Sequence, residues 1–365
     1  MTNPEASIDT IVRRFQGAET GTIQYKAHGT GHIHQTYWVQ QDHRQYLLQQ
    51  VNHTVYPDVE GMMNNVLRVT EHLRHKLNSQ SDTTLTTLRV IPTRDGSLCY
   101  QDAAGRFWRM FDFVAPSVAY NVTPSAIYAQ EAGRAYGQFQ AFLLDLPAPT
   151  LHEVIPSFHH LGHRLRQFEK VLAEDRVRRA GYVRREIAFV HQRAEELLRL
   201  DQLVARDELP VRVTHNDTKL NNLLFDPTTQ RVRCVVDLDT VMPGTVLYDF
   251  GDAIRTIAGT VAEDTVDLKK VTLSLPYYQA FAQGYLSAAH FLTPIEIAHL
   301  PLSARYMTFI MGLRMLTDYL AGDVYYKIDH PEHNVQRTRV QFQLVRRMEE
   351  QFDRMNEIVQ RLVGR

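Results

Sequence analysis

The pattern of apolar and polar residues changes near residue 115. Before this point, turn signals separate short stretches rich in β-branched and aromatic residues, which is typical of strands. These stretches cover residues 37–39, 46–50, 88–91 and 107–114. One helical pattern interrupts them from about Asp58, with apolar side chains at Val66, Val69, Leu73 and Leu77. We therefore expect a β-rich unit with one helix over residues 1–115.

After residue 115 the pattern becomes helical. Thr123-Pro124-Ser125 is typical of a helix start. Apolar positions recur at helical spacing in residues 161–205, 301–322 and 336–363. One β-like segment, residues 211–239, predicts a strand, a polar loop, a strand, a turn and a strand. Such an embedded loop is where we expect the chemistry. The chain is thus predicted to be an α+β protein whose second unit, residues 116–365, is mainly helical.

Composition and charge exclude several classes of protein. Lys and Arg total 40 and Asp and Glu total 41, so the net charge of −1 gives no general attraction to nucleic acid or anionic membrane. The start of the chain has no signal-peptide core, and no apolar run approaches the roughly 18 residues of a membrane span. Cys99 and Cys234 are interpreted as reduced thiols. We expect a cytoplasmic protein, either a monomer or a weak homo-oligomer.

The polar loop carries the candidate chemistry. It runs from His215 to Asn222, and Asp237 follows at the end of an apolar run. Asp217 can accept or orient the proton of an attacking hydroxyl, and a hairpin would bring Asn222 and Asp237 together as oxygen ligands. Magnesium prefers a few carboxylates together with phosphate oxygens and water. The spacing therefore favours phosphoryl transfer, although Asp and Asn in a loop also form ordinary turns.

The pattern H-x-D-x-x-x-x-N followed by a distant Asp is the catalytic-loop and metal-ligand pattern of the protein-kinase-like fold. His-Arg-Asp is absent and Asp237 is followed by Leu238-Asp239 rather than by Phe-Gly, and the chain resembles the aminoglycoside phosphotransferase and choline kinase superfamily. Longer strings, HNDTKLNNLLFD and GLRMLTDYLAGDVYYK among them, resemble the N-acetylhexosamine 1-kinase family. This resemblance implies two lobes and transfer of the ATP γ-phosphate to the anomeric hydroxyl of N-acetylglucosamine or N-acetylgalactosamine.

The resemblance also implies roles for residues of the loop and its surroundings. Asp217 matches the catalytic aspartate, and Asn222 and Asp237 match the Mg²⁺ ligands. Asp239 has two interpretations, as a ligand of a second metal or as a hydrogen-bond acceptor within the loop. Asp249 and Asp252 are expected to be structural, for example as caps of a helix from about Phe250. Gly29, Thr30 and Gly31 match the loop that covers the phosphates, although a plain hairpin turn also explains them.

One departure from the family concerns the third strand. Most members place a lysine there to hold the α- and β-phosphates, whereas residues 46–50 contain none and Gln49 occupies about that position. Glutamine donates hydrogen bonds but brings no charge, which leaves the nucleotide preference open. Lys219, two residues after Asp217, is the candidate for the missing positive charge at the γ-phosphate. The alternative is a loop lysine that faces solvent.

The acceptor site has fewer signals. Arg314 lies in an otherwise apolar helical stretch, where a charge is costly unless it is paired. It either pairs with Asp318 or faces the substrate, and the resemblance favours substrate. Tyr325, His32 and His34 are further candidates for sugar contacts. Two rival functions stay open: a kinase for another acceptor (a different sugar, an aminoglycoside, choline or homoserine), and a pseudokinase that binds nucleotide without transferring phosphate.

Overall fold

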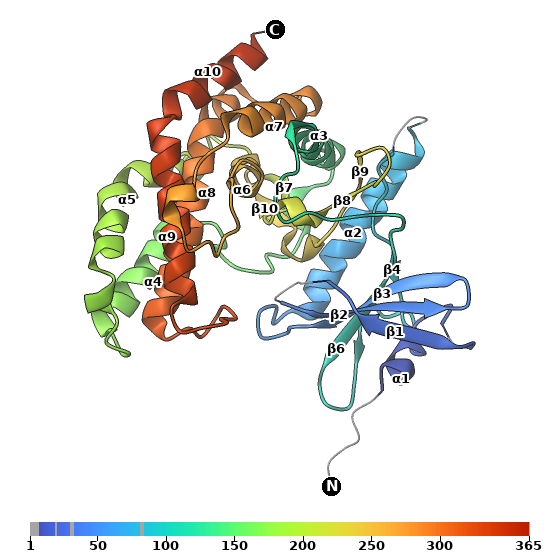
Figure 1. Cartoon of the computed structure of the whole chain (residues 1–365). Helices are drawn as coiled ribbons and strands as arrows, with labels where there is room; N and C mark the ends of the chain where they lie inside the picture. The colour runs from blue at the N-terminus through green and yellow to red at the C-terminus, as the bar shows by residue number, and fades with distance from the viewer. Residues whose placement is uncertain (1–6, 19, 30–32, 81–83, 365) are drawn as a thin grey trace.

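The computed structural model describes residues 7–18, 20–29, 33–80 and 84–364. Figure 1 shows a small lobe built around a β-sheet and a large lobe built from helices, as the sequence predicts. Among the described residues, no helix is both long and apolar enough to cross a membrane.

The small lobe contains an antiparallel six-stranded sheet. Its main path runs in the order β1-β2-β3-β6-β4, and β5 pairs with β6. The strands are β1 (Ile23–Ala27), β2 (Gln35–Gln41), β3 (Arg44–Val51), β4 (Val90–Ile91), β5 (Tyr100–Gln101) and β6 (Phe107–Asp112). The apolar pattern did not indicate β1, because four of its five residues are exposed.

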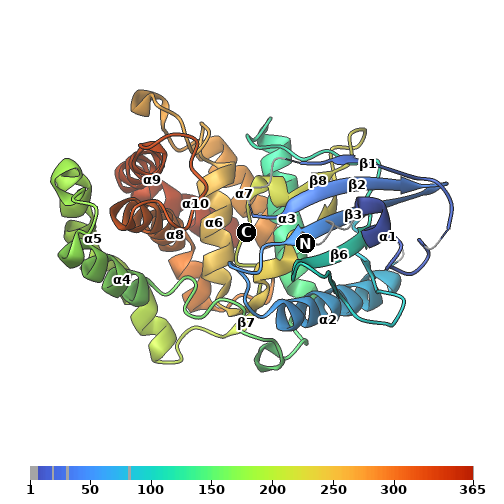
Figure 2. The same cartoon turned by 90° about the horizontal axis from the view of Figure 1, so that it is seen from below.

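Two helices cover opposite faces of this sheet (Figures 1 and 2). The short helix α1 (Ile8–Val12) packs on the face that carries Tyr46, Leu48 and Met110. The long helix α2 (Val59–Asn78) packs on the other face, next to Val51 and Phe111. Because side chains alternate along a strand, Gln49 and Arg109 lie on the same face as Val51 and Phe111. Both polar side chains therefore point toward α2 and the large lobe.

The large lobe is organised around the long helix α8 (Pro294–Ala321), which packs against α4, α6 and α9. Thr293 and Glu296 form a capping box at its start, and Gly322 ends it with φ of 100°. The other helices are α3 (Ala126–Phe142), α4 (Leu161–Glu174), α5 (Arg184–Ala205), α6 (Val246–Ile257), α7 (Leu275–Ala288), α9 (His333–Glu350) and α10 (Phe352–Val363). The helical pattern over 161–205 corresponds to the two helices α4 and α5.

The β-like segment lies between the sheet and the helices (Figure 2). It has the predicted order: β7 (Arg212–Thr214), the polar loop, β8 (Leu223–Phe225), a turn and β9 (Val232–Val235). β8 and β9 form the expected hairpin. The helical turn η4 (Leu238–Thr240) then leads into β10 (Met242–Gly244), which pairs with β7. This arrangement holds both ends of the candidate loop against the large lobe.

Helix α6 can approach α8 only because Gly251 has no side chain. A Cβ atom at Gly251 would stand 2.2 Å from the backbone oxygen of Ser303. We expect Gly251→Ala to lower the free energy of unfolding by about 1–3 kcal/mol, because the two helices must separate. Urea unfolding measures the change, with Gly181→Ala as the control, since a Cβ there meets nothing within 4 Å. Equal stability of the two variants would contradict this account of the crossing.

Candidate active site

A buried carboxylate on α6 organises the candidate loop. Asp249 accepts hydrogen bonds from the backbone N–H groups of His215 (2.9 Å) and Asn216 (2.7 Å). Burial raises the pKa of Asp249, while the His215 ring and these N–H groups oppose that rise. The expected capping of a helix near Phe250 is wrong: α6 begins at Val246, and Thr245 caps it. The backbone N–H groups needed partners inside the protein, and Asp249 supplies them.

His215 serves the backbone of the loop. Its Nδ1 accepts a hydrogen bond from the Asp217 N–H (3.2 Å), and its Nε2 lies 2.9 Å from the Val236 backbone oxygen. These partners assign the proton to Nε2. The residue is fully buried, with Tyr136 and Phe139 against its ring. His215 therefore fixes the direction in which Asp217 leaves the loop.

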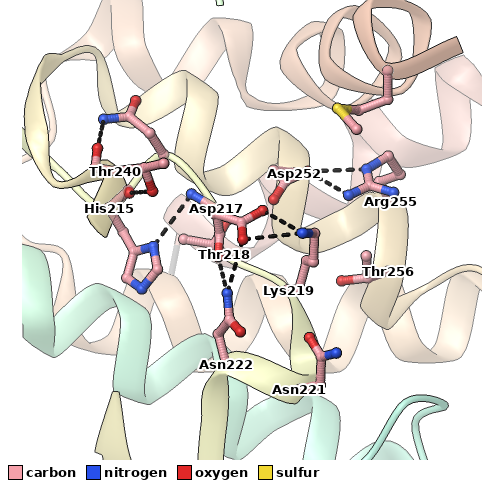
Figure 3. Close-up of polar contacts among 12 residues, drawn as sticks. His215, Asp217, Thr218, Lys219, Asn221, Asn222, Thr240, Asp252, Arg255 and Thr256 are labelled. Carbon is pink, nitrogen blue, oxygen red and sulfur yellow. Dashed lines mark hydrogen bonds and ion pairs between the residues drawn. The ribbon is translucent and has the colours of Figure 1, made fainter. Parts of the chain in front are cut away.

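Asp217, Lys219 and Asn222 form one cluster, and Figure 3 shows the three side chains pointing toward one another. The Lys219 Nζ atom lies 2.7 Å from Oδ1 and 3.0 Å from Oδ2 of Asp217. Asn222 donates from Nδ2 to the backbone oxygen (2.7 Å) and to Oδ2 (3.1 Å) of Asp217. Burial acts to raise the pKa of Asp217, but the Lys219 charge outweighs it and the pKa is lowered. The cluster thus holds a carboxylate and an ammonium side by side.

Asn222 and Asp237 are brought together by the β8–β9 hairpin. The Val236 N–H donates to the Asn222 backbone oxygen at 2.9 Å, one residue before Asp237. Since the Asn222 Nδ2 atom is directed to Asp217, its side-chain oxygen is left for another partner. Asp237 has a left-handed backbone with φ of 60°, and its exposed carboxylate forms no hydrogen bond or ion pair within the described part of the chain. Two oxygen donors therefore remain unused.

The electrostatics of this pair suit a divalent cation. Although water reaches the Asp237 carboxylate, the protein packed around it, and then the charges of Asp239 and Asp217, raise the pKa of Asp237. A bound cation would relieve that repulsion. No group of three or more His, Cys, Asp or Glu side chains suited to a metal occurs among the described residues. One carboxylate and one amide oxygen are a donor set that suits Mg²⁺, which keeps water and phosphate oxygens as its other ligands.

The small lobe contacts this region through a network that the sequence did not reveal. Gln49 donates from Nε2 to the Thr36 hydroxyl (3.1 Å) and accepts from Arg109 Nε (2.9 Å). Arg109 is directly opposite Gln49 in the β3–β6 register. Its guanidinium binds Asp239 through two bonds of 2.5 and 2.9 Å. His34 also contacts Asp239, at 2.6 Å. Both oxygens of Asp239 therefore have protein partners.

The predicted phosphate-covering loop is described only in part. Gly29 has φ of 76°, a conformation in the left-handed region that favours glycine. Thr30, Gly31 and His32 lie outside the described residues.

Arg314 does not pair with Asp318, so that alternative is wrong. Asp318 instead accepts backbone N–H groups of Val324, Tyr325 and Tyr326, together with the Asn334 amide. The Arg314 guanidinium lies against three aromatic rings. Its central carbon is 4.7 Å from the ring centroid of Phe158 and 5.8 Å from those of Tyr325 and Tyr326. Burial acts to lower the pKa of Arg314, but Tyr326, Tyr325 and Asp217 raise it. Arg314 thus faces aromatic rings near Asp217 without an acidic partner among the described residues.

The structure therefore collects the sequence candidates into three groups. Asp217, Lys219, Asn222 and Asp237 lie around the loop, and Arg314 and Tyr325 share the aromatic cluster. His34 contacts Asp239 directly, and Gln49 is connected to Asp239 through Arg109. Sequence reasoning missed Arg109 and Phe158. Arg109 had a usable signal, because it is a charge in the apolar run Phe107-Trp108-Arg109-Met110-Phe111. Phe158 had none, since an aromatic residue in a loop is common.

Residues 24–291 match the phosphotransferase enzyme family, and the chain belongs to this family of small-molecule kinases. Solved structures similar to it include a microcompartment-associated aminopropanol kinase (17% identity, 95% of this chain and 97% of that chain covered, TM-score 0.62). A choline kinase from Cryptosporidium parvum is also similar (13% identity, 95% of this chain and 96% of that chain covered, TM-score 0.58). A third similar structure is spectinomycin phosphotransferase in complex with ADP and spectinomycin (13% identity, 99% of this chain and 98% of that chain covered, TM-score 0.54). At these identities the likeness to solved structures supports the fold alone.

The contacts of Asp249 predict a loss of local order when its charge is removed. In Asp249→Asn, one of the two N–H groups of His215 and Asn216 faces the new NH2 group, which cannot accept a hydrogen bond. An unsatisfied buried donor costs about 1–3 kcal/mol, so amide hydrogen exchange in residues 215–219 is expected to rise about tenfold to hundredfold. Mass spectrometry of the exchanged peptides measures this, with the exposed Asp353→Asn as control. Unchanged exchange in the loop would show that Asp249 does not hold it.

Proposed function

We propose that the protein is a kinase that transfers the γ-phosphate of Mg-ATP to the anomeric hydroxyl of an N-acetylhexosamine. The observation that carries the acceptor class is Arg314, a guanidinium that lies among Phe158, Tyr325 and Tyr326 without an acidic partner in the described chain. Aromatic rings pack against sugar faces, and guanidinium N–H groups bind hydroxyl and carbonyl oxygens. A neutral sugar with an N-acetyl group offers both kinds of contact.

The charge around this cluster argues against cationic acceptors. Arg164 donates to the Phe158 backbone oxygen from two nitrogens, at 3.0 and 2.8 Å. Burial, and then the charge of Arg314, lower the pKa of Arg164 to about 10, so it is still a cation at neutral pH. Two positive charges therefore meet at Phe158. Choline and aminopropanol are themselves cations, and like charges at close range oppose their binding.

In this proposal Asp217 orients the acceptor hydroxyl. Its lowered pKa makes it a weak base, which suits an anomeric hydroxyl because that group is more acidic than an ordinary alcohol. Lys219, which contacts both oxygens of Asp217, would neutralise charge on the transferred phosphate. Asn222 and Asp237 would hold Mg²⁺, which supplies further charge neutralisation when bound. The small lobe around Gly29 would cover the phosphates.

The proposal predicts the outcome of a phosphate-transfer assay from Mg-ATP. A panel of N-acetylhexosamines, other sugars, choline, aminopropanol and aminoglycosides is expected to give product only with the N-acetylhexosamines. That product should be acid-labile and lack reducing-sugar reactivity, both of which are properties of an anomeric phosphate. Asp217→Asn should lower turnover by about 10²-fold or more, because the hydroxyl loses its proton acceptor.

Other results of the panel would change the proposal. An acid-stable product, or transfer only to an amine, would discard the N-acetylhexosamine acceptor and leave the kinase assignment. Nucleotide binding without transfer to any acceptor would favour the pseudokinase alternative.

Arg314 provides a second prediction for the acceptor site. Arg314→Gln keeps one hydrogen-bond donor but removes the charge, and hydrogen bonds to charged groups are worth about 1.5–3 kcal/mol. We expect the KM for the sugar to rise about tenfold to hundredfold, with a smaller change in the KM for ATP. The exposed Arg166→Gln on α4 is the matched control. A rise confined to the ATP KM would place Arg314 at the nucleotide instead.

A further inference from the structure

Three separate parts of the small lobe converge on one carboxylate of the large lobe. Arg109 comes from β6, His34 precedes β2, and Gln49, on β3, holds Arg109 in place. The carboxylate belongs to Asp239 in η4, and Arg109 and Asp239 are each only 2% exposed. The His34 ring is itself fixed, because its Nδ1 accepts the Asn52 N–H at 3.1 Å. We call this Arg109–Asp239 contact, with Gln49 and His34, the interlobe clamp.

Each of the three side-chain nitrogens of Arg109 donates to a protein acceptor. Nε donates to Gln49, Nη1 donates to Asp239 and lies 3.7 Å from the Met63 sulfur, and Nη2 donates to Asp239. A planar guanidinium that binds a carboxylate through two parallel bonds has a fixed position. Arg109 is therefore a cation of the small lobe at the strand position next to Gln49, but its charge is directed to Asp239.

The place of Asp239 in the chain gives this contact a consequence. Asp239 lies two residues after Asp237, and the turn η4, which contains Asp239, begins directly after the left-handed backbone of Asp237. A clamp on Asp239 therefore limits the positions that the Asp237 carboxylate can adopt. The Asp237 side chain itself forms no hydrogen bond or ion pair within the described residues. Its placement depends on the backbone on either side of it.

We propose that Arg109 is a positioning residue for the cation site: through Asp239 it fixes Asp237, and it thereby replaces the strand lysine without touching the nucleotide. The inference rests on the proposed binding of Mg-nucleotide and is independent of the acceptor. In this proposal, two functions that a single strand lysine would combine are carried by different residues. The clamp sets the geometry of the cation ligand, and the charge at the phosphates comes from the cation and Lys219.

The test measures ADP binding by calorimetry with and without Mg²⁺, which requires no catalysis. In Arg109→Met, the affinity for ADP without Mg²⁺ is expected to stay within about twofold of wild type. The gain in affinity on adding Mg²⁺ should fall at least about tenfold. Arg109→Lys should restore part of that gain, since lysine keeps the charge but not the two parallel bonds. Arg89→Met is the matched control, because Arg89 directly precedes β4 and its ion pair with Asp112, the last residue of β6, is exposed.

Three results would overturn the proposal. An equal loss of ADP affinity with and without Mg²⁺ would mean that Arg109 contacts the phosphates directly. Unchanged binding in Arg109→Met would make the clamp purely structural. Loss of the Mg²⁺ gain in Asp239→Asn but not in Arg109→Met would make Asp239 a metal ligand. If wild type itself binds no ADP, the proposed kinase function fails before the clamp is tested.

A double variant tests the proposal even if Arg109→Met alone prevents the protein from folding. Removing Arg109 alone leaves His34 as the remaining hydrogen-bond partner of the buried Asp239 carboxylate in the described part of the chain, which destabilises the protein. Arg109→Met combined with Asp239→Asn removes both charges, so its melting temperature is expected to lie closer to wild type. The Mg²⁺ gain in ADP affinity should nevertheless stay lost, because nothing then fixes Asp237. A double variant that regains the full gain would contradict the clamp.

Discussion

The carboxylate of Asp249 is the contact on which the candidate site depends. The loop after β7 turns sharply, with Asn216 at φ of 63°, and its backbone N–H groups face the protein interior rather than water. Asp249 accepts two of them, and Gln140 donates to the same carboxylate at 2.7 Å. The carboxylate is therefore satisfied although it is buried. Because Asp249 belongs to α6, the packing of α6 on α8 sets the position of Asp217.

The aspartates of this region differ in their surroundings, and these differences shift their pKa values in different directions. Lys219 lowers the pKa of Asp217 against the effect of burial, and Arg109 does the same for Asp239. The protein packed around Asp237 and the neighbouring carboxylates raise the pKa of Asp237, which forms no ion pair with a cation among the described residues. Asp237 is thus the carboxylate whose charge is least compensated by the protein. Differences of this kind, rather than residue type, distinguish a cation ligand from a structural carboxylate.

The sequence predicted the parts of the fold and of the site's arrangement that depend on local spacing. The hairpin that joins Asn222 to Asp237 follows from two apolar runs and a turn, and the structure contains it. The contact between Gln49 and Arg109 depends on the register of β3 and β6, which lie 60 residues apart in the chain. Asp318 is one helical turn from Arg314, yet the chain after Gly322 folds back and its N–H groups occupy that carboxylate. Such long-range competition for a partner leaves no local pattern.

Most residues proposed to contact the acceptor lie outside the region that matches the family, which explains why the family alone does not define the substrate. The matched region, residues 24–291, contains Asp217, Asn222, Asp237 and Asp249, which form or support the proposed site of phosphoryl transfer. Arg314, Tyr325 and Tyr326 follow that region, on α8 and the segment after it. Only Phe158, among the four members of the aromatic and guanidinium cluster, lies inside it. A common scaffold can therefore hold the phosphates while residues beyond it select the acceptor by charge and shape.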